Sequence, residues 1–286
     1  MREARESPFR RRHLIELHEQ PWFPETWRDL FRAGLGKAFV LFGLSRECAR
    51  AVDRFLEHHR AAEMLDLCSG SGELSADTVR RANESGRFPR CTLVMSDLYP
   101  DRPRWTTHQE TSGFVEAPLD YRSIRSDLPR TWMMLNALHH LRPEELREFL
   151  RHAADAADAV VMIDRDARNW REMFMTILVV PLAAAFITAF MVRPFRPRNL
   201  LWGLVVPVIP LVALVDGLVS NLRSYTVAEL ERVVEDLGAS FTWEIGRTPG
   251  GEGVPPMTYI FGFRAAGDMP SPLRRGLGLR GAGPRA

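Results

Sequence analysis

Residues 63–75, EMLDLCSGSGELS, combine an apolar run, a turn of small residues and the start of a helix. The apolar run 63–68 is typical of a buried strand. Small residues in the turn 69–72 let a ligand approach the backbone, and N–H groups at a helix start can bond it. The next expected strand ends in Asp97, whose carboxylate can accept both hydroxyls of a ribose. These features predict a nucleoside site at the carboxyl ends of the strands.

Short strands and helices alternate along most of the remaining chain, which predicts an α/β, Rossmann-like fold. We expect a mostly parallel sheet with helices on both faces. Thr226 and Glu229 form a capping box, a signal for the start of a helix. Strands are expected at 63–68, 92–97, 113–120, 131–136, 159–164, 241–245 and 258–263, and helices at 73–85, 143–157 and 226–237.

The N-terminal part shows a different pattern. Apolar residues recur at helical spacings over 13–59, with interruptions at Pro21 and Pro24. This pattern predicts a helical cap that packs on the core. The apolar segment 35–44 leaves a membrane anchor as the alternative for that stretch.

The composition limits the classes of function. The 286 residues have a formal net charge of +2, which argues against a nucleic-acid partner. Cys48, Cys68 and Cys91 have no CxxC spacing, so they favour a reducing compartment and argue against a structural zinc site. No group of His, Asp or Glu has the sequence spacing of metal ligands, so we expect no metal.

Four motifs, DLCSGSG (66–72), SDLYP (96–100), LDYRSI (119–124) and NALHHL (136–141), resemble those of class I S-adenosylmethionine-dependent methyltransferases. The first is most similar to the motif of ubiquinone/menaquinone C-methylases. The resemblance implies a seven-stranded sheet with an antiparallel last strand. A third glycine is missing from the turn, which argues against a nicotinamide oxidoreductase.

The whole chain also resembles a bacterial group of this superfamily that carries a hydrophobic insertion. EQPWFP (19–24), RTWMMLNALHHLRP (130–143) and VDGLVSNLRSYT (215–226) carry that resemblance.

The methyltransferase resemblance implies which residues bind S-adenosylmethionine. Asp97 would hold the ribose, Leu98 would lie against the adenine, Asp120 would face the adenine amino group and Tyr121 would stack nearby. Asn136, at a strand end, is expected to bond the cofactor or the substrate. The residues implied to line the methionine part are Asp66, Cys68, Gly70 and Gly72.

His139 and His140 follow the fourth expected strand, at the mouth of the expected pocket. Either could be a general base, because imidazole titrates near neutrality. The alternative is that both serve packing and helix entry, since the sulfonium is already an activated leaving group and orientation alone can carry the transfer.

A hydrophobic insertion, 167–224, interrupts the core after the fifth expected strand. The segments 173–192 and 199–215 contain no charged residue, and each reaches or approaches the length that crosses a bilayer. Three interpretations remain open, namely a transmembrane hairpin, an anchor lying in the membrane plane, and a buried lid that forms a homodimer.

The loop of the hairpin favours the anchor. It carries Arg193, Arg196 and Arg198, which oppose full insertion from the cytoplasmic side. Three prolines also argue against two full spans, because they are expected to break both helices. They are Pro181, Pro207 and Pro210. We therefore expect a cytoplasmic protein bound through 172–222 to the inner face of the membrane.

The last apolar run ends at Asp216, and Arg223 lies two helical turns later on the same face. These two residues either form an interfacial ion pair or, together with Tyr225, return to the pocket and touch the substrate.

Together these features predict a membrane-associated methyltransferase that moves a methyl group in line to a lipophilic acceptor such as a quinone, polyene or lipid. A non-catalytic membrane-associated protein that retains the fold for cofactor binding or assembly is the alternative. The expected divisions are a cap at 1–60, a core split between 61–166 and 225–264, the insertion at 167–224, and a disordered tail at 265–286.

Overall fold

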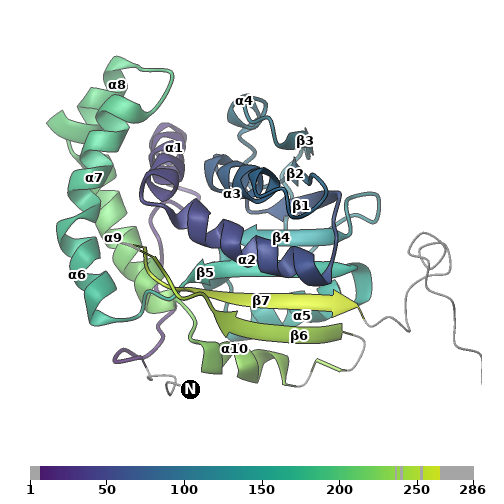
Figure 1. Ribbon diagram of the computed structural model, residues 1–286. Coiled ribbons are helices and arrows are strands. Elements are labelled where there is room, and N and C mark those ends of the chain that lie inside the picture. Colours follow the sequence, from purple (N-terminus) through teal and green to yellow (C-terminus); the bar gives the residue numbers. More distant parts are fainter. Residues whose placement is uncertain (1–6, 236, 239–240, 252–253, 265–286) are drawn as a thin grey trace, which may run out of the picture.

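The computed structural model describes residues 7–235, 237–238, 241–251 and 254–264, so the expected tail, 265–286, lies outside it. Seven strands form one sheet in the order β3-β2-β1-β4-β5-β7-β6 (Figure 1). The strands are β1 Glu63–Leu67, β2 Thr92–Met95, β3 Thr111–Phe114, β4 Thr131–Leu135, β5 Ala159–Arg165, β6 Phe241–Arg247 and β7 Met257–Arg264.

The pairing confirms the expected mixed sheet. The first five strands run parallel, whereas β7 is antiparallel to both β5 and β6. The third strand is shorter than expected and ends at Phe114. The expected range reached residue 120, but Pro118 has no N–H to donate to a ladder, and the register with β2 already shifts between Leu93 and Val94.

Helices cover both faces of the sheet, as the alternation predicted (Figure 1). Met64 belongs to the core cluster with α2 (Leu44–His58) and α3 (Glu73–Glu84). Its neighbour Leu65 belongs to the cluster with α5 (Pro143–Ala156) and α10 (Val227–Val234). Successive strand residues therefore fill opposite cores, as the pleat of a strand requires.

The capping box at α10 is confirmed. The Glu229 N–H donates to Thr226 Oγ1 at 3.3 Å, and the Thr226 N–H donates to Glu229 Oε2 at 2.9 Å. The helix ends at Val234, before the expected residue 237.

The N-terminal part contains helices only from α1 (Glu25–Leu41) onward. The expectation of helical structure from residue 13 is wrong, because 13–24 forms turns and irregular backbone. Pro21 and Pro24 cannot donate helical hydrogen bonds, and Pro24 immediately precedes α1. The stretch 35–44 runs from the end of α1 to the first residue of α2, and Phe39 of α1 packs on the core.

The insertion forms a hairpin beside the sheet (Figure 1). One arm is a 22-residue helix, Trp170–Met191, made of α6, α7 and the π-helical turn η2; the other arm bends by 61° before α9. The elements of the hairpin are α6 Trp170–Leu178, α7 Val180–Phe186, η2 Ile187–Met191, α8 Pro197–Leu200, η3 Leu201–Val205 and α9 Val208–Arg223.

The expected effect of the prolines holds for one of the three. Pro207 lies at the 61° bend. Pro181 and Pro210 do not break a helix, because each lies in the first turn of its element, where a missing N–H costs no bond. By length and composition, the described residues hold one helix able to cross a membrane, or two if the bent pair is one span.

The inner side of the hairpin packs on α1. Phe31 and Leu30 of α1 form a buried cluster with Ile209, Val212 and Ala213 of α9. This contact places α1 between the sheet and the hairpin, and it fixes the hairpin over the carboxyl ends of the central strands.

Candidate active site

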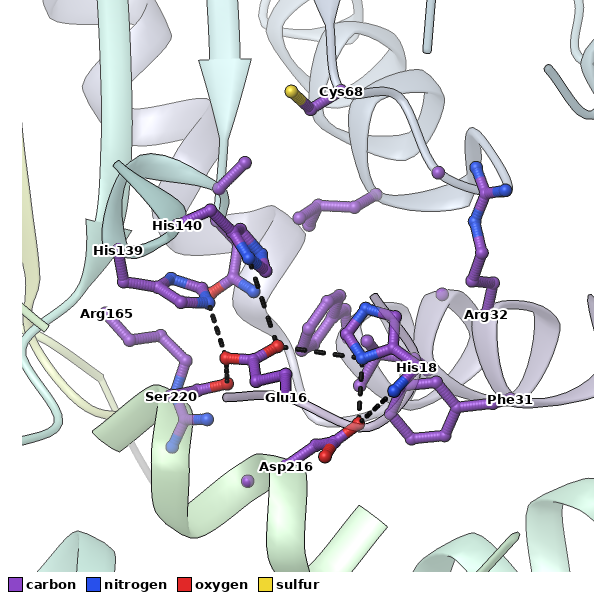
Figure 2. Close-up of a pocket in the computed structure, with 18 of the residues that line it drawn as sticks. Glu16, His18, Phe31, Arg32, Cys68, His139, His140, Arg165, Asp216 and Ser220 are labelled. Atoms are coloured by element: carbon purple, nitrogen blue, oxygen red, sulfur yellow. Dashed lines mark hydrogen bonds and ion pairs between the residues drawn. The ribbon is translucent and has the colours of Figure 1, made fainter. Parts of the chain in front are cut away.

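A cavity of about 610 Å³ opens where β1, β4 and β5 end. Cys68 and Gly70 line it on the sheet side. The hairpin lines its other side with apolar side chains, including Val180, Ala184 and Ala213, and with polar ones such as Asp216 and Ser220. Figure 2 shows Cys68 and Arg32 across the cavity from a group of acidic and histidine side chains. One cavity therefore joins the glycine turn to the apolar hairpin.

The turn after β1 has the backbone that its small residues predicted. Gly70 and Gly72 have φ of 59° and 87°, the left-handed region that favours glycine. A Cβ on Gly72 would lie 2.9 Å from Trp105 Cδ1, whereas one on Gly70 would meet nothing within 4 Å. Gly72 is thus required by packing, and the free space beside Gly70 is available to a ligand.

Asp97 closes this end of the cavity. Its Oδ2 accepts a hydrogen bond from the Gly70 N–H at 2.8 Å, and its Oδ1 accepts one from the Tyr99 N–H at 2.8 Å. Arg32 Nη2 of α1 lies 3.2 Å from Oδ2. The strand end, the glycine turn and the cap therefore position this carboxylate together.

Most of the residues that the resemblance implied for the cofactor lie on this cavity. Asn136, at the end of β4, has φ of 52°, and its backbone N–H donates to Ile163 O at 2.7 Å. Asp66 and Gly72 are outside the lining. The implied residues that do line the cavity are Cys68, Gly70, Asp97, Leu98, Asp120, Tyr121 and Asn136.

Asp66 lies behind the turn. Its side chain is fully buried in β1, and burial raises the pKa of its carboxyl to about 7. A carboxyl with this pKa is partly protonated at neutral pH.

His139 and His140 both line the cavity, on the short turn η1 (Leu138–His140) after β4. His139 is fixed by Asp164 at the end of β5, whose Oδ2 lies 2.8 Å from His139 Nδ1 and accepts the His139 backbone N–H at 2.7 Å. Burial would raise the pKa of Asp164, but the charge and hydrogen bonds of His139 hold that pKa below its ordinary value.

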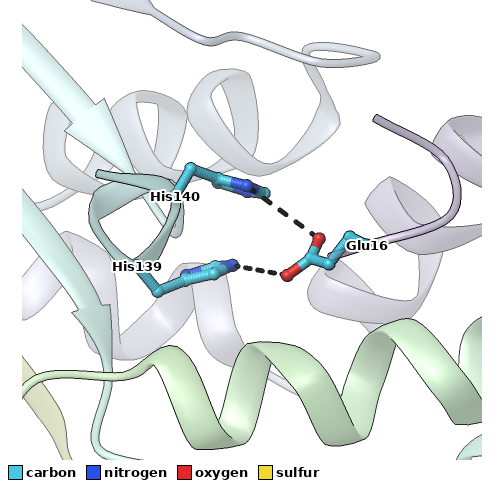
Figure 3. Close-up of side chains that lie close together, drawn as sticks. All are labelled: Glu16, His139 and His140. Atoms are coloured by element: carbon cyan, nitrogen blue, oxygen red, sulfur yellow. Dashed lines mark ion pairs between the residues drawn. The ribbon is translucent and has the colours of Figure 1, made fainter. Parts of the chain in front are cut away.

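The other nitrogen of His139 faces Glu16. Nε2 lies 3.8 Å from Glu16 Oε1, and His140 Nδ1 lies 3.9 Å from Glu16 Oε2 (Figure 3). The Glu16 side chain is 1% exposed, and Ser220 of α9 donates to its Oε1 at 2.8 Å. Three distant parts of the chain therefore meet at one carboxylate.

His140 also contacts Glu19. Burial would lower the pKa of His140, but the carboxylates of Glu16 and Glu19 raise it to about 9. Burial would raise the pKa of the Glu19 carboxyl, but His140 and Arg223 hold that pKa far below its usual value.

Only one of the three residues expected near the substrate lines the cavity. Asp216 lines the cavity and accepts hydrogen bonds from the N–H groups of Leu17 and His18 at 2.7 and 3.1 Å. Arg223 and Tyr225 are buried outside the lining.

Both charged residues of α9 bind the N-terminal segment rather than each other. Arg223 lies 3.2 Å from Glu16 and 3.0 Å from Glu19, and within the described chain it does not pair with Asp216. The ion pair between Asp216 and Arg223, one of the two interpretations left open by the sequence, is therefore wrong. Tyr225 donates its hydroxyl to Leu141 O at 2.7 Å.

Sequence reasoning missed Glu16, His18, Glu19 and Asp164. The first three lie in 13–24, which was expected to be helical but is not, and Figure 2 shows Glu16 and His18 among the side chains that line the cavity. Sequence spacing also argued against a metal, and spacing cannot detect a cluster built from segments far apart in the chain. The sequence feature that could have revealed these residues is the group of acidic and histidine residues beside two prolines in HLIELHEQPWFP (13–24).

No protein-family model and no curated protein matches this chain. Among solved structures, the plantazolicin methyltransferase BpumL in complex with SAH has a TM-score of 0.55 over 87% of this chain and 95% of that one. This chain has the class I methyltransferase fold. The identity to BpumL is 10%, so the likeness establishes the fold alone.

A second plantazolicin methyltransferase, BamL, in complex with a triazolic desmethylPZN analog and SAH, gives a TM-score of 0.52 at 12% identity, again over 87% and 95% of the two chains. The methyltransferase fold expected from the motifs is thus confirmed. The closer resemblances, to quinone C-methylases and to one bacterial group, stay predictions.

Proposed function

We propose that this chain is a membrane-associated S-adenosylmethionine-dependent methyltransferase with a lipophilic acceptor. The observation that carries the proposal is the single cavity that runs from the glycine turn and Asp97 to the apolar inner side of the hairpin. A polar nucleoside binds against polar walls, and an apolar acceptor binds against apolar ones. For transfer, the methyl group of the cofactor and the acceptor atom must also lie next to each other.

The residues at the sheet end fit the cofactor. The space beside Gly70 is open to the cavity, and the carboxylate of Asp97 borders it. Asp97 would hold the ribose hydroxyls, while Cys68 and Asn136 would border the methionine part. When bound, the cofactor supplies a methyl group on a positively charged sulfur, whose S–CH₃ bond breaks as the acceptor atom bonds the methyl carbon and sulfur keeps the electron pair.

The chain's own residues would orient the acceptor. Asp164 fixes the ring of His139, so its Nε2 faces Glu16 at the polar part of the cavity. Apolar groups of the hairpin would hold the hydrocarbon part of the acceptor and exclude water from it. The polar group of the acceptor would then lie at Glu16 and His139, and its proton would pass to water.

The outer face of the hairpin supports membrane association. Trp170, Leu182 and Val205 are 70%, 74% and 73% exposed. Soluble monomers rarely expose a large contiguous apolar surface, so this face is suited to lipid. Arg193 and Arg196, at the tip, are exposed and suited to lipid phosphates. The hairpin would then lie at the inner face of the cytoplasmic membrane.

The test uses the full chain, radiolabelled S-adenosylmethionine and a bacterial lipid extract. We expect calorimetry to show cofactor binding and the label to appear in the organic phase. Binding without transfer would support the non-catalytic alternative. Absence of both would overturn the proposal.

A further inference from the structure

Glu16 lies among three imidazole rings that come from two distant parts of the chain. His139 Nε2, His140 Nδ1 and His18 Nδ1 are 3.8, 3.9 and 3.6 Å from its carboxylate oxygens. These separations exceed those of ordinary hydrogen bonds. In a tetrahedral zinc site with bonds of about 2.0–2.1 Å, the ligand atoms are about 3.4 Å apart. Small movements would therefore place one ion between these atoms.

The outer contacts of His139 are those of a metal ligand. Asp164 binds Nδ1 at 2.8 Å, which fixes the ring and leaves Nε2 for the cavity. Histidine ligands in metal sites commonly bond a carboxylate in this way through their second nitrogen. Ser220 adds a hydrogen bond to Glu16 at 2.8 Å, which holds the carboxylate in place.

The charges around the cluster also favour a cation. Four carboxylates meet here, and the permanently charged Arg223 contacts two of them, those of Glu16 and Glu19. Buried charges need compensation, which either protons on the histidines or a bound cation can supply. The four carboxylates belong to Glu16, Glu19, Asp164 and Asp216.

We propose that Glu16, His139 and His140 bind one divalent transition-metal ion. Two imidazoles and a carboxylate suit zinc and its neighbours, and three protein ligands leave one position open to the cavity. The ion would take His140 Nδ1 from Glu19, and Glu19 would keep its contact with Arg223.

The consequence for chemistry rests on the proposed function. An acceptor hydroxyl at the open position would bind the ion through oxygen, and its pKa would fall. The O–H bond then breaks, the proton passes to water, and the oxygen becomes the nucleophile. The acceptor class is thus a hydroxyl-bearing lipophile, and the histidines hold the ion rather than take the proton.

Metal binding can be measured without cofactor or acceptor. The full chain, freed of metal with a chelator and carrying no polyhistidine tag, is titrated with Zn²⁺ by calorimetry. We expect one ion per chain. Glu16→Gln and His139→Ala should each weaken binding at least tenfold, whereas His58→Ala, at an exposed histidine outside the cluster, should not change it.

A second measurement guards against misfolded variants. The Co²⁺ form of the wild type should show the absorption bands of tetrahedral cobalt, and His139→Ala should alter them while its thermal unfolding stays cooperative. No saturable binding, or equal affinity in the wild type, Glu16→Gln and His139→Ala, would overturn the metal site. Zn²⁺ bound with no methyl transfer would instead count against the proposed function and leave the metal site standing.

Discussion

Asp164 binds His139 twice, through the ring at 2.8 Å and through the backbone N–H at 2.7 Å. One carboxylate at the end of β5 therefore sets both the path of η1 and the orientation of the imidazole. This contact joins two neighbouring strands at the point where the cavity opens. It also fixes which nitrogen of His139 faces Glu16.

Asp164→Asn should reduce methyl transfer by roughly ten- to a hundredfold, because an amide cannot provide the same charge to the ring. Cofactor affinity should change little, since Asp164 is not among the residues proposed to hold the cofactor. Initial rates with labelled cofactor and calorimetry test the two effects on one protein. Asp166→Asn, at a carboxylate paired with Arg247, is the matched control. Equal rates in the two variants would contradict the role given to Asp164.

Asp97→Ala should weaken cofactor binding about ten- to a hundredfold, because a charge-assisted hydrogen bond contributes roughly 1.5–3 kcal/mol. Calorimetry with S-adenosylmethionine measures this. Asp101→Ala removes a nearby carboxylate that pairs with Arg104, and it should leave the affinity unchanged. Unchanged affinity in Asp97→Ala would remove Asp97 from the cofactor site.

Asp66 should make folding stability depend on pH. Burial raises its pKa in the folded chain to about 7, from an ordinary value of 3.8. Between these values the folded state keeps a proton that the unfolded state has released, so stability falls as pH rises from about 4 to 7. The loss has an upper bound of roughly 4 kcal/mol.

Asp66→Asn removes this titration. The variant should be more stable than the wild type at pH 8, and the difference should vanish near pH 4. Urea unfolding at a series of pH values gives the difference, and Asp155→Asn, at an exposed carboxylate of α5, should give none. A difference between Asp66→Asn and the wild type that does not vary with pH would show that Asp66 is ionised in the folded chain.

The sequence was sufficient where the signals are local. The turn 69–72, the capping box at Thr226 and the alternation of strands and helices each depend on residues close in the chain, and each was observed. Asp97 was found in the same way, because a strand end has a fixed place in this fold.

The end of the cavity that contains Glu16 and His139 could not be predicted in this way. Glu16 and His139 meet only because 13–24 leaves the helical path and crosses between η1 and α9. The segment was expected to belong to the helical cap, so its polar residues were not assigned to the cavity. A three-dimensional contact between segments far apart has no spacing rule, so both the cluster and the partners of Arg223 were missed.

The hairpin gives the last prediction. Replacing 172–222 by a linker would also remove Asp216 and Ser220, which hold the N-terminal segment. Charges on the outer face are a sharper test. Leu182→Glu with Val205→Glu should abolish sedimentation with phosphatidylglycerol/phosphatidylethanolamine vesicles, because a carboxylate opposes burial in lipid.

The same double variant should keep its cofactor affinity and its transfer to an acceptor dissolved in detergent, while it loses transfer to an acceptor held in vesicles. The physical reason is that a bilayer-bound acceptor must otherwise cross water, which costs about 0.8 kcal/mol per methylene. Thr242→Glu, on the exposed edge of β6, adds a similar charge far from the hairpin and should change none of these properties. Vesicle binding that survives in the double variant would place the membrane contact elsewhere, and 35–44 would be the next segment to test.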